Sequence, residues 1–142
     1  MKYVDASAVL RILFQEPGPA VSLTPGDRVV SSQLVEVETF RAVDRERLLG
    51  HLDDLQTAIK RRELTELLAM IDLAAVDTTV IARAKGAFPV NVRALDAIHV
   101  ATAEILEMEA LDDAVEFWTH DERQAGAALS RGLSVRGTTA ME

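Results

Sequence analysis

Five acidic residues in four separated stretches of the chain could take part in one chemical site. Asp5 and Asp121 each follow a short stretch of β-forming residues, so each carboxylate is expected at the carboxyl end of a strand. Asp96, and one of Glu36 and Glu38, lie in the first turns of expected helices. In an open parallel α/β sheet, ligands bind beyond the carboxyl ends of the strands, where the following helices begin. The spacing therefore predicts that four carboxylates meet at one rim of a sheet.

Such a group of carboxylates favours a divalent cation as its ligand. Two like charges about 5 Å apart repel by roughly 3 kcal/mol at an effective dielectric constant near 20. A fold tolerates this repulsion when the acids are separated, paired with basic side chains, or bound to a cation. Mg²⁺ and Mn²⁺ prefer oxygen ligands, and they also contact phosphate oxygens and stabilise the charge of an in-line displacement. The pattern therefore predicts metal-assisted hydrolysis of phosphodiester bonds.

Each acid also has a purely structural interpretation. Asp5 could cap the helix that follows it, and Asp121 could do the same for a later helix. Asp96 could interact with the dipole of its own helix, although its apolar neighbours favour a role with a partner. Residues two apart on a helix point about 200° apart, so only one of Glu36 and Glu38 can face the rim.

Two histidines and two hydroxyl residues lie beside these acids. His99 follows Asp96 by three residues on the same side of the helix, which is compatible with a metal or acid–base pair but more typical of a packed core histidine. His120 could also reach the rim, but the sequence has no His-rich ligand spacing of the kind that zinc prefers. Ser7 and Thr119 could orient a water molecule or cap a helix.

The hydrophobic pattern and the turn residues predict helices that alternate with single strands. This order favours a parallel sheet flanked by helices, and Ser7, Ser32 and Asn91 are the expected caps of three of the helices. The expected strands cover residues 1–4, 28–31, 73–76, 115–119 and 133–136. The expected helices cover residues 7–16, 19–23, 32–49, 52–70, 77–86, 93–108 and 122–131. The basic triplet Lys60-Arg61-Arg62 is interpreted as a solvated helix face, with phosphate contact as the alternative.

Composition limits the class of protein. The chain has 142 residues, 49% of them hydrophobic, which fits a single domain over residues 1–142. It has no cysteine and no apolar run long enough for a membrane span, so we expect a cytoplasmic protein. The formal net charge of -8 argues against broad coating of nucleic acid, which needs many basic residues. A focal site with a metal ion, and a basic protein partner, remain compatible with this charge.

Four stretches of the sequence match the pattern of a known family, in the family's order and across nearly the whole chain. They are YVDASA at residues 3–8, SSQLVEVE at residues 31–38 followed by Arg41-Ala42, LDAIHVATA at residues 95–103, and THD at residues 119–121. On these residues the chain resembles the PIN-domain ribonucleases, and most closely the VapC toxins of bacterial toxin–antitoxin pairs.

The resemblance implies a three-layer α/β/α domain with a central parallel sheet and an acidic pocket that binds Mg²⁺ or Mn²⁺. Asp5, Glu38, Asp96 and Asp121 match the four acids of the family, as catalytic residues and metal ligands. Glu38 is chosen over Glu36 because the family's acid follows Val and precedes the Arg-Ala pair. The resemblance further implies RNA as the substrate and a cognate VapB-type antitoxin as a partner, and we expect a homodimer.

His99 and Thr119 also match common residues of the family. His99 stands where the family often has histidine beside its Asp, which supports the packed-core interpretation. Thr119 stands where a hydroxyl residue often precedes the last acid. In the expected site Asp5 and Asp96 hold the cation, and Glu38 and Asp121 complete its shell or position the attacking water. Arg41 and Arg93 are the candidate contacts to phosphate.

The expected function is therefore a metal-dependent endoribonuclease of the VapC type, with two alternatives. A receiver-like signalling domain also has a strand-end Asp and a metal ion, but it needs paired acids after the first strand and a Lys at a late strand end. Here Asp5 is followed by Ala6 and Ser7, and no such Lys is present. The second alternative is a PIN-like domain that binds RNA or a protein partner without catalysis.

Overall fold

A computed structural model describes residues 1–139 as helices that alternate with parallel strands. The strands are β1 (Lys2–Val4), β2 (Val29–Ser32), β3 (Asp72–Ala74), β4 (Glu116–Trp118) and β5 (Ser134–Arg136). The helices are α1 (Ala6–Phe14), α2 (Leu34–Leu48), α3 (Asp54–Leu68), α4 (Thr78–Ala84), α5 (Ala94–Glu109) and α6 (Glu122–Ser130). The expected alternation is confirmed. The prediction of one domain over residues 1–142 stays a prediction, and its last three residues lie outside those described.

The five strands form one parallel sheet in the order β3-β2-β1-β4-β5. β1 lies at its centre, where Tyr3 pairs with Val30 of β2 and with Phe117 of β4. The chain builds the sheet outward from β1 to β3 on one side and then returns to place β4 on the other. The carboxyl ends of β1 and β4 therefore flank the point where the strand order reverses, which is where such sheets bind ligands.

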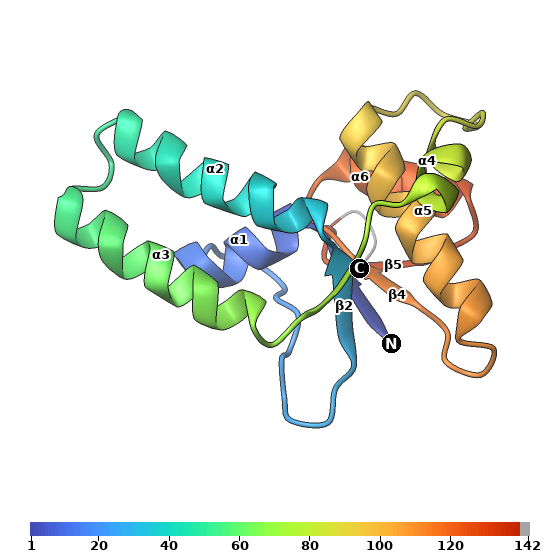
Figure 1. Ribbon diagram of the computed structural model, residues 1–142, viewed down its shortest axis with the longest axis horizontal. Helices are drawn as coiled ribbons and strands as arrows, with labels where there is room; N and C mark the ends of the chain where they lie inside the picture. Colours follow the sequence, from blue (N-terminus) through green and yellow to red (C-terminus); the bar gives the residue numbers. More distant parts are fainter. Residues whose placement is uncertain (140–142) are drawn as a thin grey trace.

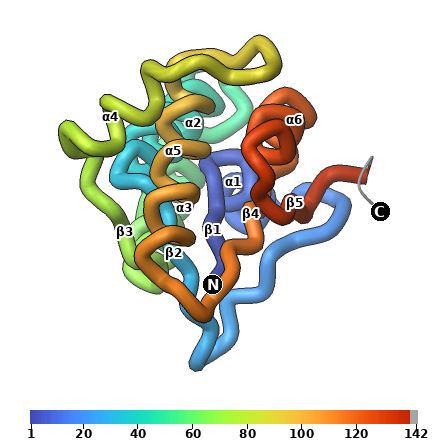
Figure 2. The backbone as a smooth tube through the Cα atoms, turned by 90° about the vertical axis from the view of Figure 1, so that its right-hand side faces the viewer, coloured from blue at the N-terminus to red at the C-terminus, as the bar shows by residue number. Residues whose placement is uncertain are grey.

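Helices cover both faces of the sheet, as the three-layer prediction requires. Helices α1, α2 and α3 lie on one face and α4, α5 and α6 on the other, with the strands between them (Figure 1; Figure 2). Alternate residues of β1 serve the two cores, because successive strand side chains point to opposite faces. Val4 packs in the cluster with α1 and α2, and Tyr3 packs in the cluster with α5 and α6.

One expected helix is absent. Residues 19–23 have no regular secondary structure, and the prediction of a short helix there is wrong. Gly18 has a φ of +112° and Pro19 follows it, so the backbone enters the segment in a conformation that does not lead into a helix. A helix of five residues would also form too few hydrogen bonds to offset the unfavourable first turn. Val21 is buried in the core, and the partly buried Leu23 packs against the same cluster.

The caps differ from those expected at three helices. Asp5 rather than Ser7 is the N-cap of α1, and its side chain accepts a hydrogen bond from the Ala8 N–H. Helix α2 begins after Gln33, although Ser32 Oγ accepts from the Leu34 N–H at 3.2 Å. Helix α5 has Arg93 rather than Asn91 at its N-cap, without a side-chain cap bond. The observed N-caps lie one or two residues from the expected ones.

The basic triplet of α3 is engaged within the protein. Lys60 donates to the Leu13 carbonyl and to Glu63, and Arg62 pairs with Glu66. The Arg61 guanidinium lies 4.9 Å from the centre of the Phe40 ring. These contacts favour the structural interpretation of the triplet. Within residues 1–139, the helices are all too short or too polar to cross a membrane.

Candidate active site

Asp5 begins the site at the carboxyl end of β1. Its side chain is 4% exposed, and Oδ1 accepts from Ser7 Oγ at 2.7 Å and from the Ala8 N–H at 2.9 Å. Oδ2 accepts from Thr119 Oγ1 at 2.5 Å. Burial raises the pKa of the Asp5 carboxyl, while these hydrogen bonds oppose the rise. The structural role weighed for Asp5, helix capping, is confirmed, and it leaves one lone pair, on Oδ2, for a further ligand.

Thr119 links Asp5 to Asp121 across the strand order reversal. While donating to Asp5, Thr119 Oγ1 accepts from the Asp121 N–H at 3.1 Å. Asp121 is the N-cap of α6, and its Oδ1 accepts from the Arg123 N–H at 2.8 Å. The expected capping role of Asp121 is thus confirmed as well. One buried hydroxyl therefore fixes the position of two of the predicted site residues relative to each other.

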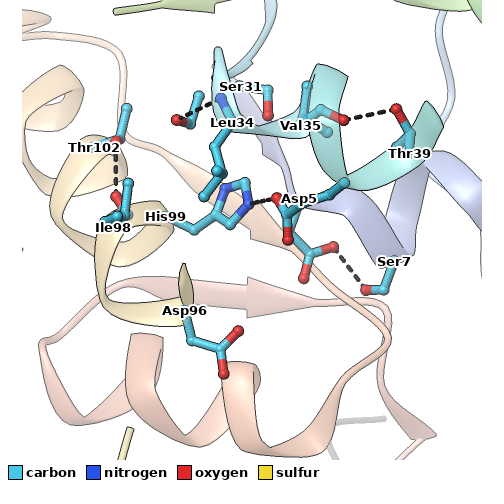
Figure 3. A network of polar contacts seen from close by, with 12 residues as sticks. Asp5, Ser7, Ser31, Leu34, Val35, Thr39, Asp96, Ile98, His99 and Thr102 are labelled. Carbon is cyan, nitrogen blue, oxygen red and sulfur yellow. Dashed lines mark hydrogen bonds and ion pairs between the residues drawn. The ribbon is translucent and has the colours of Figure 1, made fainter. Parts of the chain in front are cut away.

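Asp96 lies in the first turn of α5 and is half-buried. Burial raises the pKa of its carboxyl, and repulsion from Asp121 and then from Asp5 raises it further. Figure 3 shows the side chains of Asp5 and Asp96 in the same region as the ring of His99. Gln124 of α6 donates to the Asp96 carbonyl at 3.2 Å, which fixes the start of α5 against α6. These interactions place Asp96 near Asp121 and Asp5, and the prediction that the three form one site stays a prediction.

Glu38 points into the molecule, toward His99, whereas Glu36 points to solvent. Glu38 is half-buried, and its Oε1 lies 2.6 Å from His99 Nε2. Glu36 is exposed on α2. This arrangement agrees with the predicted orientation of the pair, in which only one of the two side chains can face the rim.

His99 is a core residue, as its apolar surroundings predicted, and it is also a neighbour of the site. It is 1% exposed, and its Nδ1 lies 2.7 Å from the Tyr3 hydroxyl. The contact of His99 with Glu38 was not predicted from the sequence. The available signal was the position of His99 one helical turn after Asp96. His120, the other histidine considered for the rim, bonds through Nδ1 to the Gly137 carbonyl at 2.6 Å.

The donor set suits a hard cation. Within the described part of the chain, neither Lys nor Arg forms an ion pair with Asp5, Asp96 or Asp121. Unpaired carboxylates that raise one another's pKa are relieved by a divalent cation, and Mg²⁺ and Mn²⁺ accept oxygen ligands. Among residues 1–139, however, no three Asp, Glu or His side chains form a ready metal cage. The carboxylates fit such an ion chemically and would have to turn toward it.

Comparison with known proteins assigns the family. A PIN domain family model matches residues 2–129, which contain all four predicted acids. The chain belongs to the PIN-domain family. The PIN domain is 34% identical over 136 residues to Ribonuclease VapC46 of Mycobacterium tuberculosis, with 94% of each chain covered. The predicted VapC-type relationship is confirmed, and the receiver-like alternative is set aside.

A solved structure supports the fold of this PIN domain. The crystal structure of PAE2754 from Pyrobaculum aerophilum matches 94% of this chain and 87% of its own, with a TM-score of 0.57 and 15% sequence identity. Likeness at this identity bears on the fold alone. It agrees with the central parallel sheet and the two helical layers of this PIN domain.

Proposed function

We propose that this PIN domain is a Mg²⁺- or Mn²⁺-dependent endoribonuclease and the toxin of a VapBC-type toxin–antitoxin pair. The observation that carries the proposal is that Thr119 bonds both Asp5 and Asp121, that Asp96 lies near them, and that within residues 1–139 none of the three aspartates forms an ion pair with Lys or Arg. Burial, and then repulsion from Asp121 and Asp5, raises the pKa of Asp96. The name of the relative, Ribonuclease VapC46, supports the reaction and the toxin role.

Four carboxylates divide the work in this proposal. Asp5 and Asp96 hold the cation, and Glu38 and Asp121 complete its shell or position the attacking water. A bound divalent cation supplies positive charge that stabilises the charge developing on the phosphate oxygens. Asp5 is the most constrained of the four, because Thr119 and Ser7 hold both of its oxygens. The cation would therefore be placed by Asp5, and the other three side chains would adjust to it.

Two arginines are proposed to contact the phosphates of the RNA substrate. Arg41 follows Glu38 by three residues, so both side chains lie on the same side of α2. Arg93 precedes Asp96 by three residues and weakly lowers the pKa of that carboxyl, which indicates that the two are near each other. Both arginines are exposed and, within residues 1–139, neither forms an ion pair.

The remaining parts of the proposal concern partners and setting. A VapB-type antitoxin would block the acidic site, and the net charge of -8 suits a basic partner segment. A homodimer in the cytoplasm is the expected form of the free protein.

The variant Asp96→Asn tests the proposal. In chelator it should melt at a higher temperature than the wild type, because it removes a repelled carboxylate. It should also lose the stabilisation that Mg²⁺ gives the wild type, and lose RNA cleavage by at least about 100-fold, since changes in residues that only support a metal ligand already cost 10–100-fold.

The matched control is Asp54→Asn, an exposed acid in the first turn of α3, far from the rim. It should keep both Mg²⁺ stabilisation and cleavage. Equal Mg²⁺ shifts in Asp96→Asn and in the wild type would remove Asp96 from the site. A wild-type protein, free of antitoxin, that cleaves no RNA with either cation would instead favour the non-catalytic alternative.

A further inference from the structure

A chain of buried hydrogen bonds crosses the sheet and ends on Glu38. The Ser32 N–H donates to the Tyr3 hydroxyl oxygen at 3.1 Å. That oxygen lies 2.7 Å from His99 Nδ1, and His99 Nε2 lies 2.6 Å from Glu38 Oε1. Tyr3 is 0% exposed and His99 is 1% exposed. The chain thus joins β2, β1, α5 and α2 through side chains that have almost no access to water.

The proton positions in this chain follow from the groups involved. An ionised carboxylate only accepts hydrogen bonds, so His99 Nε2 carries the proton that lies between it and Glu38. In a neutral imidazole Nδ1 is then the acceptor, and the Tyr3 hydroxyl donates to it while accepting from the Ser32 N–H.

Packing holds the two rings in place. Tyr3 stacks on Phe117 with ring centroids 5.0 Å apart and an interplanar angle of 14°. The ring of His99 meets Tyr3 edge-on, at 5.9 Å and 78°. A flipped imidazole would put carbon atoms where its nitrogens now meet Tyr3 and Glu38, and would leave buried polar groups unpaired. The direction of the His99 Nε2–H bond toward Glu38 is therefore fixed.

Glu38 depends on this donor. Its side chain is 22% exposed, and within residues 1–139 its ion-pair partner is His99 rather than a Lys or Arg. Bonded to His99 through Oε1, the carboxylate has no hydrogen bond to Oε2 within residues 1–139. Without His99, a half-exposed glutamate on the early part of α2 could turn into solvent, because nothing else described in the structure bonds it.

We propose that His99 is a positioning residue for Glu38, and that Tyr3 fixes the tautomer of His99 that this requires. The inference rests on the proposed function, since it assigns His99 to the support of one of the four carboxylates. It differs from the interpretation of His99 as a core histidine that merely packs, because packing alone needs no defined tautomer and no contact with Glu38.

Three substitutions separate positioning from packing. His99→Leu fills the core without a donor, His99→Gln keeps an N–H group on a side chain of similar reach, and Tyr3→Phe keeps the ring that stacks on Phe117. Val100→Ala, which leaves a small cavity at the next buried residue of α5, is the matched control. All are measured for Mn²⁺ affinity by calorimetry with the metal alone, and for the turnover number and KM of RNA cleavage.

We expect His99→Leu to weaken Mn²⁺ binding by about tenfold or more and to lower the turnover number with little change in KM, as for other residues that support metal ligands. His99→Gln should keep most of the wild-type affinity for Mn²⁺. The Mn²⁺ affinity of Tyr3→Phe should lie between those of His99→Gln and His99→Leu. Val100→Ala should lose thermal stability alone. Unchanged Mn²⁺ affinity in His99→Leu and Tyr3→Phe, or an equal loss in Val100→Ala, would overturn the proposal.

The nitrogen chemical shifts of the His99 ring provide a readout without metal or RNA. The wild type should show the Nε2-protonated tautomer, and Tyr3→Phe should show a mixture of tautomers. An Nδ1-protonated ring in the wild type would overturn the proposal even if the variants fold poorly. Failure of the proposed function is distinguishable, because there the wild type itself binds no Mn²⁺ and cleaves no RNA.

Discussion

At the scale of single residues, capping a helix and serving a site are compatible uses of one carboxylate. Asp5 uses Oδ1 to cap α1, while Oδ2 is held by Thr119. Asp121 caps α6 in the same way. The helix starts orient both side chains toward the rim before any ligand is bound. A structural role for these residues therefore prepares the proposed one rather than replacing it.

The hydroxyl of Thr119 is expected to stabilise this arrangement. In Thr119→Val, Asp5 Oδ2 and the Asp121 N–H would both lose their buried partner, so we expect a loss of about 1–3 kcal/mol in the free energy of unfolding. Chemical denaturation measures this loss. Thr65→Val, at an exposed position where the hydroxyl bonds only to the Arg61 carbonyl, is the control and should change stability by less than about 0.5 kcal/mol. Equal effects of the two variants would contradict the coupling role of Thr119.

The raised pKa of Asp96 predicts a pH dependence of stability. Because the folded chain holds this proton more tightly than the ordinary value of 3.8 implies, the group favours folding below about pH 3.8. That contribution is lost as the pH rises through the raised folded pKa. In chelator, the stability of Asp96→Asn relative to the wild type should therefore increase across this window and then level off. Unfolding measured at a series of pH values checks this, and a difference that is constant with pH would contradict it.

Sequence alone predicted which acids meet but not what holds them. Strand ends and helix starts share one side of a parallel sheet, so topology was sufficient to place Asp5, Asp96 and Asp121 together. The bond from His99 to Glu38 depends on which way two side chains point between α5 and α2. Periodicity specifies the buried face of each helix but not the partner across the interface, so this contact required coordinates.

At the scale of elements, the turn after β5 packs closely against the end of β4, next to the site. Gly137 has a φ of +98°, and a Cβ there would lie 2.6 Å from the Thr119 carbonyl oxygen. That carbonyl belongs to the residue that links Asp5 to Asp121. The close approach of this turn to the end of β4 therefore requires glycine for two reasons, the backbone conformation and the missing side chain.

Two glycine substitutions separate these reasons. Gly132→Ala has a similar φ of +87° with open space around it, and we expect about 1–3 kcal/mol of destabilisation from backbone strain alone. Gly137→Ala adds the steric conflict, so it should be clearly more destabilising and should lower any cation-dependent stabilisation as Thr119 shifts. Thermal unfolding with and without Mg²⁺ compares them. Equal losses in the two variants would show that the contact with Thr119 is unimportant.

The element boundaries show where local sequence is decisive and where it is not. Asp53 and Gln56 form a capping box that starts α3, and this pattern is readable from the sequence. At residues 19–23 the apolar pattern suggested a helix, but Gly18 and Pro19 set the backbone there. At α5, Asn91 was expected as the cap, yet Arg93 occupies that position without a side-chain bond. Tertiary contacts select among starts that local chemistry leaves nearly equivalent.

At the scale of the whole molecule, the charge of -8 restricts how RNA can bind. The chain has 15 basic residues against 23 acidic ones, and several of the basic ones already form ion pairs with acids. The excess of acidic charge repels phosphates over most of the surface, so the proposed contact with RNA is small and close to the metal site. Binding should accordingly depend weakly on salt.

This gives a numerical prediction. If Arg41 and Arg93 are the main phosphate contacts, the logarithm of RNA affinity should fall with the logarithm of salt concentration with a slope of about -1.4, at roughly 0.7 per contact for a single strand. Arg41→Ala or Arg93→Ala, each made in the inactive Asp96→Asn protein, should reduce the slope by about 0.7. Arg62→Ala, which breaks a surface ion pair on α3, should leave it unchanged. A much steeper slope would require further basic contacts.

The central position of β1 also governs when the site can exist. Asp5 precedes the residues that bond and face it, Thr119 and Asp121, by more than a hundred positions. Until β4 inserts beside β1, the Asp5 carboxylate has neither the Thr119 hydroxyl nor the Asp121 carboxylate as a neighbour. A ribosome-bound chain therefore carries an incomplete centre while those residues are being added. A nuclease built in this way can attack RNA only after β4 and the start of α6 have left the ribosome.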